Sequence, residues 1–76
     1  MQKNIIRYMN DYGKILRLRR FELNIKQKEL CNRIGCTLAT LNRLEKGMNV
    51  STKTFLKACE ELRLSIELKP LNDEKD

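Results

Sequence analysis

Histidine is absent from this 76-residue chain, and its three cysteines include no Cys-x-x-Cys pair. Without histidine, a zinc site would need carboxylates to complete its ligands, so we expect no metal and no cofactor. No glycine-rich loop is present to cradle a phosphate, and no base is placed to activate a nucleophile, which argues against an enzyme. We expect Cys31, Cys36 and Cys59 to be small buried side chains in a reducing compartment.

Long apolar runs are also missing. No segment is long enough to cross a bilayer, and no signal-peptide core follows the N-terminus, so we expect a cytoplasmic protein. The length suits one small domain near the lower limit for independent folding, which favours a dimer. The net charge of +6 favours an anionic partner such as nucleic acid, although a solvated lysine-rich surface has the same composition.

The single proline, Pro70, lies near the C-terminus, so no proline interrupts a helix before it. Apolar residues at helical spacing predict helices over residues 11–24, 27–34 and 38–46, with a fourth that begins at Ser51 or Thr52. The expected inner face of the fourth helix consists of Phe55, Leu56, Cys59 and Leu62. Residues 1–10 form an N-terminal arm, an extension of the first helix, or a strand.

The periodicity changes after the fourth helix. Leu64, Ile66 and Leu68 alternate with polar residues, which predicts a half-buried strand over residues 64–71. We expect residues 72–76 to be a disordered tail. A lone strand leaves its backbone groups unpaired, and the simplest solution is pairing with the same segment of a second copy.

Residues 27–46 combine the features that two short helices need in order to meet at a steep angle. Gly35 can adopt the positive φ of the turn, and Thr37 is a natural N-cap for the second helix. The apolar inner faces and the corner between the helices are supplied by Leu30, Cys31, Ile34, Cys36, Leu41 and Leu44. An ordinary helical hairpin is the alternative interpretation of this pattern.

The segment QKELCNRIGCTLATLNRLEKG resembles the helix-turn-helix of the Xre/Cro family, which includes the phage repressors. The flanking LRLRR and STKTFLKACEELRLS extend the resemblance over residues 11–66, and the ending TFLKACEELRLSIELKPL is most similar to HipB-like antitoxins. The resemblance implies a mostly α, lambda-repressor-like DNA-binding domain of four to five helices over residues 11–63. It also implies that the C-terminal β-strand pairs across a homodimer.

In this family the second helix of the motif, here residues 38–46, enters the major groove of DNA. The resemblance therefore implies base contacts from Leu38, Ala39, Asn42 and Arg43. Arg43 suits guanine, Asn42 suits adenine or a phosphate, and the two apolar side chains suit thymine methyl groups. Many relatives have polar residues at positions 38 and 39, so we also expect readout of DNA shape.

The resemblance further implies a phosphate contact at Gln27, where the side-chain amide, backbone N–H groups and helix dipole can face one anion. The other phosphate candidates are Lys28, Thr37, Thr40 and Lys46. Arg20 and Glu45 occupy positions that form a buried ion pair in many relatives, and we expect that role here.

The favoured function is a homodimeric transcriptional repressor that binds a palindromic operator in double-stranded DNA. The HipB-like ending extends this hypothesis to an antitoxin that represses its own operon and binds a HipA-like kinase toxin. One alternative is a phage- or plasmid-type regulator without a toxin partner. Another is a protein-interaction module that does not bind DNA, which the apolar Leu38 and Ala39 would favour.

Overall fold

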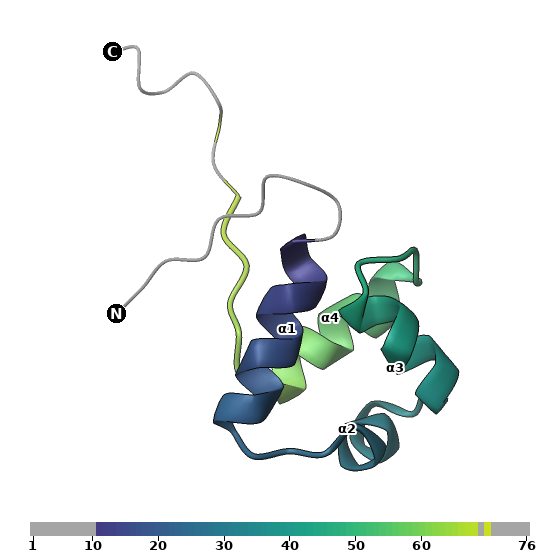
Figure 1. Ribbon diagram of the computed structural model, residues 1–76. Helices are drawn as coiled ribbons and strands as arrows, with labels where there is room; N and C mark the ends of the chain where they lie inside the picture. Colours follow the sequence, from purple (N-terminus) through teal and green to yellow (C-terminus); the bar gives the residue numbers. More distant parts are fainter. Residues whose placement is uncertain (1–10, 69, 71–76) are drawn as a thin grey trace.

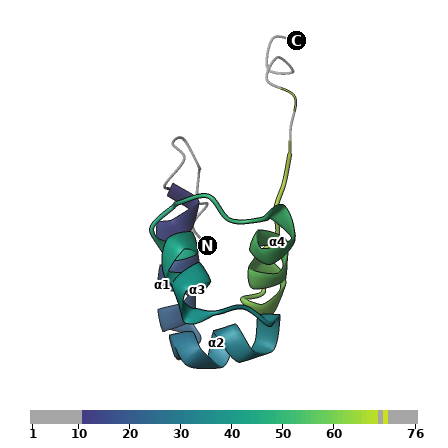
Figure 2. The ribbon, with the colours of Figure 1, turned by 90° about the vertical axis from the view of Figure 1, so that its right-hand side faces the viewer.

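The computed structural model describes residues 11–68 and 70, and within them the chain forms four helices. They are α1 (Asp11–Glu22), α2 (Gln27–Ile34), α3 (Leu38–Glu45) and α4 (Thr52–Glu61). Helix α2 lies across one end of the domain, with α1 and α3 on one side of it and α4 on the other (Figures 1 and 2). The expected arm at residues 1–10 and tail at residues 72–76 lie outside the described residues.

The core lies between the four helices and is built from aliphatic side chains of each. The most deeply buried large side chains are Leu30, Leu41, Leu44 and Leu62. Complete burial of such a side chain contributes about 1.5–3 kcal/mol relative to exposure. Helices α2 and α3 supply half of the buried core residues, namely Leu30, Cys31, Ile34, Leu41 and Leu44, so the core holds the two halves of the motif at a fixed angle.

Helix boundaries follow local signals in the sequence. Helix α2 has the predicted bounds, and α4 begins after Ser51, whose hydroxyl oxygen accepts a hydrogen bond from the Thr54 amide at 3.1 Å. Helix α1 ends at Glu22, two residues before the predicted end, because the chain turns through Asn24 with a φ of 58°. Helix α3 ends at Glu45, and Lys46 is its C-cap.

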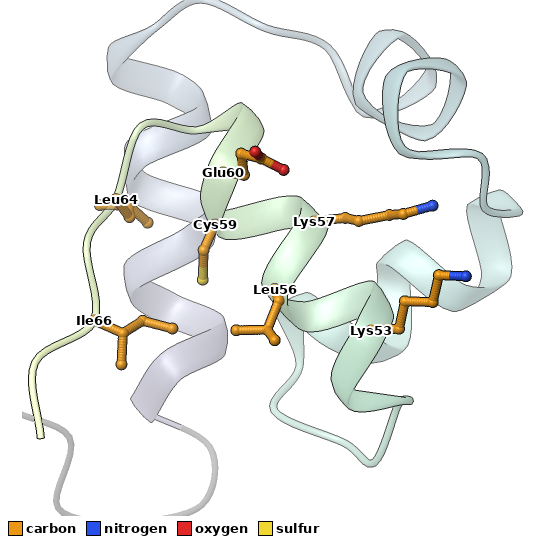
Figure 3. Close-up of a pocket in the computed structure, with 7 residues that line it drawn as sticks. All are labelled: Lys53, Leu56, Lys57, Cys59, Glu60, Leu64 and Ile66. Atoms are coloured by element: carbon orange, nitrogen blue, oxygen red, sulfur yellow. The ribbon is translucent and has the colours of Figure 1, made fainter.

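One prediction about the inner face of α4 is wrong. Leu56 is 49% exposed, whereas Ala58 is completely buried beside Cys59. Ala58 lies three residues from Phe55, which packs against the core, and four from Leu62, and this spacing defines the buried stripe. Leu56 lies at the edge of the stripe and lines an open groove, where it faces Ile66 of the C-terminal segment (Figure 3).

The described residues contain no β-strand. Residues 64–68 follow α4 without regular secondary structure, and along them the exposed fraction rises from a partly buried Leu64 to 50% at Ile66 and 90% at Leu68. The mostly α fold is therefore as predicted, but the C-terminal strand is absent within the described part of this single chain. A strand needs a partner for its backbone groups, so pairing with a second copy stays a prediction.

Candidate nucleic-acid interface

The turn between α2 and α3 is closed by backbone hydrogen bonds at Gly35. This residue has the left-handed conformation, with a φ of 73°, and its amide donates to the Cys31 carbonyl at 2.8 Å. The Cys36 amide donates to the same carbonyl at 3.1 Å. Thr37 then caps α3, because its hydroxyl oxygen accepts a hydrogen bond from the Thr40 amide at 3.1 Å. The turn thus redirects the chain within three residues and starts α3 with a satisfied N-terminus.

A buried ion pair joins α1 to the end of α3. Arg20 Nε donates to Glu45 Oε2 at 2.7 Å, and Arg20 Nη2 donates to Glu45 Oε1 at 3.2 Å. The side chains of Arg20 and Glu45 are only 7% and 6% exposed. Arg20 Nη1 also donates to the Ile25 carbonyl, and its guanidinium lies over the Phe21 ring, 4.8 Å from the centroid. The sequence-based assignment of this pair therefore agrees with the geometry.

Gln27 extends this pair toward the surface. Its Nε2 atom donates to Glu45 Oε1 at 3.0 Å and to Asn42 Oδ1 at 3.0 Å. The side-chain amide nitrogen, which we expected to face a phosphate, therefore has both hydrogens directed at α3. The resemblance located an important residue, but its nitrogen belongs to a contact between the two helices of the motif.

The residues expected to contact bases share the outer face of α3. Leu38 is 51% exposed, and Ala39, Asn42 and Arg43 are also exposed. The opposite face of the same helix consists of the buried Leu41, Leu44 and Glu45. The helix therefore separates an inner anchoring face from an outer face that is open to a ligand.

Arg43 also contacts the loop after α3. Its Nη2 atom donates to the Asn49 carbonyl at 2.9 Å, and the Met48 amide donates back to the Arg43 carbonyl at 2.9 Å. The other donors of the guanidinium remain on the exposed side of α3. Asn49 was not identified from the sequence, because its contribution is a backbone carbonyl that carries no residue signature.

The candidate phosphate contacts lie at the N-terminal ends of α2 and α3 and at the C-cap of α3. Thr37 is exposed and its hydroxyl donates to Thr40 Oγ1 at 3.0 Å, so the two hydroxyl groups are adjacent. Lys28 is exposed in the first turn of α2, and Lys46 is exposed at the C-cap of α3. Lys26, the N-cap residue of α2, makes no side-chain capping bond, so no side chain from this position occupies the first N–H groups of the helix.

Gly13 is a position whose importance sequence reasoning missed. A Cβ atom at this position would lie 2.6 Å from the Glu45 carbonyl oxygen and 2.7 Å from the Leu44 carbonyl oxygen. Helix α1 therefore approaches the C-terminus of α3 backbone to backbone. The hydroxyl of the adjacent residue, Tyr12, donates to the Met48 carbonyl at 3.0 Å. A glycine inside a helical pattern was the available signal of close packing.

The cysteines have the surroundings of core side chains. Cys31 and Cys59 are buried, and all three thiols are free. Burial, together with a hydrogen bond with Cys31, raises the pKa of Cys36 to about 11, and burial also raises the pKa of Cys59. Both thiols are therefore protonated near neutral pH. A cysteine acts as a nucleophile only as the thiolate. Over the described range, no group of three potential metal ligands occurs, and no helix is long and apolar enough to span a membrane.

Comparisons with known proteins identify the family of this chain. No curated protein sequence gives a significant match. Among solved structures, "MDT Protein" and "Structure of HipA-HipB-O2-O3 complex" each have 29% sequence identity and a TM-score of 0.78, covering 93% of this chain and 99% of the matched chain. "HipB-O4 20mer complex" has 29% identity and a TM-score of 0.77 over the same shares of the two chains. The sequence model of the family described as "Helix-turn-helix" matches residues 15–69, and the chain therefore belongs to the helix-turn-helix family.

Proposed function

We propose that this protein is a transcriptional repressor that inserts α3 into the major groove of a specific DNA operator. The observation that carries the proposal is the division of α3 into two faces. Its inner face is held by the core and the Arg20–Glu45 pair, while Leu38, Ala39, Asn42 and Arg43 are all exposed on the outer face. The likeness to the structures "Structure of HipA-HipB-O2-O3 complex" and "HipB-O4 20mer complex" supports DNA as the ligand.

The backbone of the DNA would be held by groups around the helix N-termini. The first N–H groups of α2 lack a side-chain cap, and the positive end of the helix dipole favours an anion there. The side chains that we assign to phosphate contacts are Lys28 in the first turn of α2, Thr37 and Thr40 at the start of α3, and Lys46 at the C-cap of α3. Gln27 would contribute its backbone N–H to this phosphate contact, because its side-chain nitrogen Nε2 already donates to Glu45 and Asn42.

The test is binding of the full chain to the DNA upstream of its own gene, measured at several salt concentrations. Replacing Lys46 with alanine should weaken binding to all duplexes and reduce the salt slope by about one phosphate contact. Replacing Arg43 with alanine should weaken the specific site more than unrelated DNA. Lys14→Ala on α1 is the matched control, because it removes the same charge from an exposed position outside both the proposed DNA interface and the groove beside α4. Equal effects of Lys46→Ala and Lys14→Ala would contradict the assignment.

The second part of the proposal is a homodimer that matches the two-fold symmetry of a palindromic operator. Its support is an open groove of about 460 Å³ between α4 and the C-terminal segment, in which Leu56, Cys59, Leu64 and Ile66 are flanked by the charged Lys53, Lys57 and Glu60 (Figure 3). The exposed Ile66 and Leu68 continue from this groove and, with Leu64, form the dimerisation segment. A chain truncated after Arg63 should sediment as a monomer, whereas the full chain should be a dimer. A truncated chain that remains dimeric would overturn strand pairing between copies.

The third part of the proposal is a partner. We assign a HipA-like kinase toxin as this partner. The support is the similarity of the chain to "Structure of HipA-HipB-O2-O3 complex". The protein would then be an antitoxin that represses its own operon. A kinase gene adjacent to this gene would support this role, as would co-purification of that kinase with the protein. The absence of both would favour a phage- or plasmid-type regulator without a toxin.

The exposed Leu38 on the outer face of α3 favours one alternative from another class, a protein-interaction module that does not bind DNA. Binding of duplex DNA at low salt separates the two functions, because phosphate contacts are strongest there. A specific site with steep salt dependence supports the repressor. No binding at low salt supports the interaction module.

A further inference from the structure

Four side chains form a continuous series of hydrogen bonds from the core to the outer face of α3. Arg20 donates to Glu45 through two atoms, at 2.7 and 3.2 Å. Gln27 Nε2 donates to Glu45 Oε1 at 3.0 Å and also to Asn42 Oδ1 at 3.0 Å. We call Arg20, Glu45, Gln27 and Asn42 the polar relay. It begins at two nearly inaccessible side chains and ends at an exposed residue that is expected to contact DNA bases.

The chemistry of the first pair fixes the orientation of the two amides. A guanidinium can only donate hydrogen bonds, and an ionised carboxylate can only accept them. Gln27 must therefore turn its nitrogen, and not its carbonyl oxygen, toward Glu45. The second hydrogen of that nitrogen points at Asn42, so Asn42 must present its oxygen to Gln27. An amide at the surface of a protein is usually free to turn over, but here each orientation follows from the one before it.

We infer that Asn42 reads DNA as a hydrogen-bond donor and that its preferred base is guanine. This inference rests on the proposed DNA binding and specifies the ligand of that site. Because Oδ1 is turned toward α2, the group that Asn42 offers to the groove is its NH₂. Guanine presents two adjacent acceptors, N7 and O6, in the major groove. Adenine pairs an acceptor with a donor, thymine presents the single acceptor O4 beside a methyl group, and cytosine presents only a donor, so all three match the Asn42 amide less well.

Gln27 is the positioning residue of this arrangement, because it acts on the DNA through Asn42. Without the Gln27 contact, the Asn42 amide is free to rotate and to form the two-bond pair with adenine that asparagine commonly makes. This inference differs from the expectation, made from the sequence, that Asn42 pairs with adenine or a phosphate. It also explains why a glutamine at the start of α2 has its nitrogen directed at α3.

The first experiment locates the Asn42 contact. Duplexes that bind the full chain are selected from a randomised library, and each guanine of the selected duplex is then replaced by 7-deazaguanine, which lacks the N7 acceptor. At one guanine the replacement should weaken binding of the wild-type protein about ten-fold. Asn42→Asp keeps an oxygen for Gln27 but presents an acceptor to the groove, so the loss at that guanine should disappear. A guanine that is read by Arg43 would retain its loss in this variant.

Asn32→Asp is the matched control, because it makes the same change of charge at an exposed asparagine of α2. It should leave every 7-deazaguanine effect unchanged. Thermal unfolding of both variants checks that the fold is retained.

The second experiment tests the role of Gln27. Gln27→Ala should reduce the discrimination between guanine and adenine at the Asn42 position about ten-fold, because the amide is released. Gln27→Lys should restore the guanine preference, since an ammonium can also donate to both Glu45 and Asn42. A role of Gln27 in folding alone would change overall affinity without changing this ratio.

The outcomes separate this inference from the proposed function. If the library yields no enriched sequence, sequence-specific DNA binding is overturned and the inference falls with it. If a sequence is enriched but Asn42→Asp retains every 7-deazaguanine effect, the repressor stands and the donor role of Asn42 is overturned. An unchanged guanine-to-adenine ratio in Gln27→Ala overturns the positioning role of Gln27.

Discussion

Helix α3 has two faces that differ in what holds them. The inner face is held by contacts with the core through Leu41 and Leu44, whose exposed fractions are 1% and 0%. The outer face is held by hydrogen bonds with other elements. Gln27 of α2 donates to Asn42, and Arg43 donates to the Asn49 carbonyl in the loop after α3. Glu45 belongs to both systems, because it is buried and also fixes the orientation of Gln27. One carboxylate therefore connects the buried anchor of α3 with the outer face that we propose binds DNA.

Removing that carboxylate should have the largest effect on stability. Glu45→Ala leaves the Arg20 guanidinium buried without its partner, and breaking a buried pair in this way costs about 3–5 kcal/mol. We expect a large fall in the melting temperature, measured by circular dichroism. Glu29→Ala is the control, because its ion pair with Arg33 at 2.6 Å is exposed and such pairs contribute about 1 kcal/mol or less. Equal melting temperatures for wild type and Glu45→Ala would show that the buried pair does not anchor α3.

A methyl group at Gly13 tests the anchoring of α3 from the side of α1. The new Cβ would meet three backbone atoms of residues 44–47 at 2.6–2.7 Å, and these atoms cannot move independently of α3. We expect Gly13→Ala to destabilise the fold by about 1–3 kcal/mol, the range for overpacking, and to weaken DNA binding through displacement of α3.

Gly35→Ala provides the contrast for this variant. No atom lies within 4 Å of a Cβ at Gly35, but its φ of 73° strains any residue with a side chain. The expected loss is about 1–2 kcal/mol, without a clash against α3. The free energy of unfolding of both variants is measured in denaturant. A larger loss for Gly35→Ala than for Gly13→Ala would contradict the importance of close packing at Gly13.

The difference between the two faces also explains which features of the fold and of the candidate site can be predicted from the sequence. The bounds of α2 and the N-cap of α3 were predictable because Gly35 and Thr37 are local signals that act within a few residues. The partners of Gln27 lie 15 and 18 residues away, so no local pattern shows which of its atoms faces a phosphate. Leu56 was misplaced because helical spacing admits it to the apolar stripe, and only packing against the other helices selects Ala58.

The two side-chain caps allow stability to be separated from recognition. Thr37 caps α3 and Ser51 caps α4 with the same geometry, each hydroxyl oxygen accepting from an amide at 3.1 Å. Replacement of either residue by alanine should cost about 1 kcal/mol. Only Thr37→Ala should also weaken DNA binding, because Thr37 lies among the proposed phosphate contacts. Similar DNA affinities for the two variants, measured where both are folded, would remove Thr37 from the interface.

Replacement of Cys36, in the corner between α2 and α3, should have the smallest effect on stability, and this effect should depend on pH. Burial, with a hydrogen bond to Cys31, raises the pKa of the Cys36 thiol from 9.0 to about 11, so the folded chain retains this proton where the unfolded chain loses it. The contribution to stability is therefore complete below pH 9.0 and is lost as the pH rises toward about 11. Cys36→Ala should lower stability slightly at neutral pH but give a shallower decline above pH 9.0, measured by denaturant unfolding at each pH. The same alkaline decline in both proteins would show that Cys36 titrates alike in the folded and unfolded states.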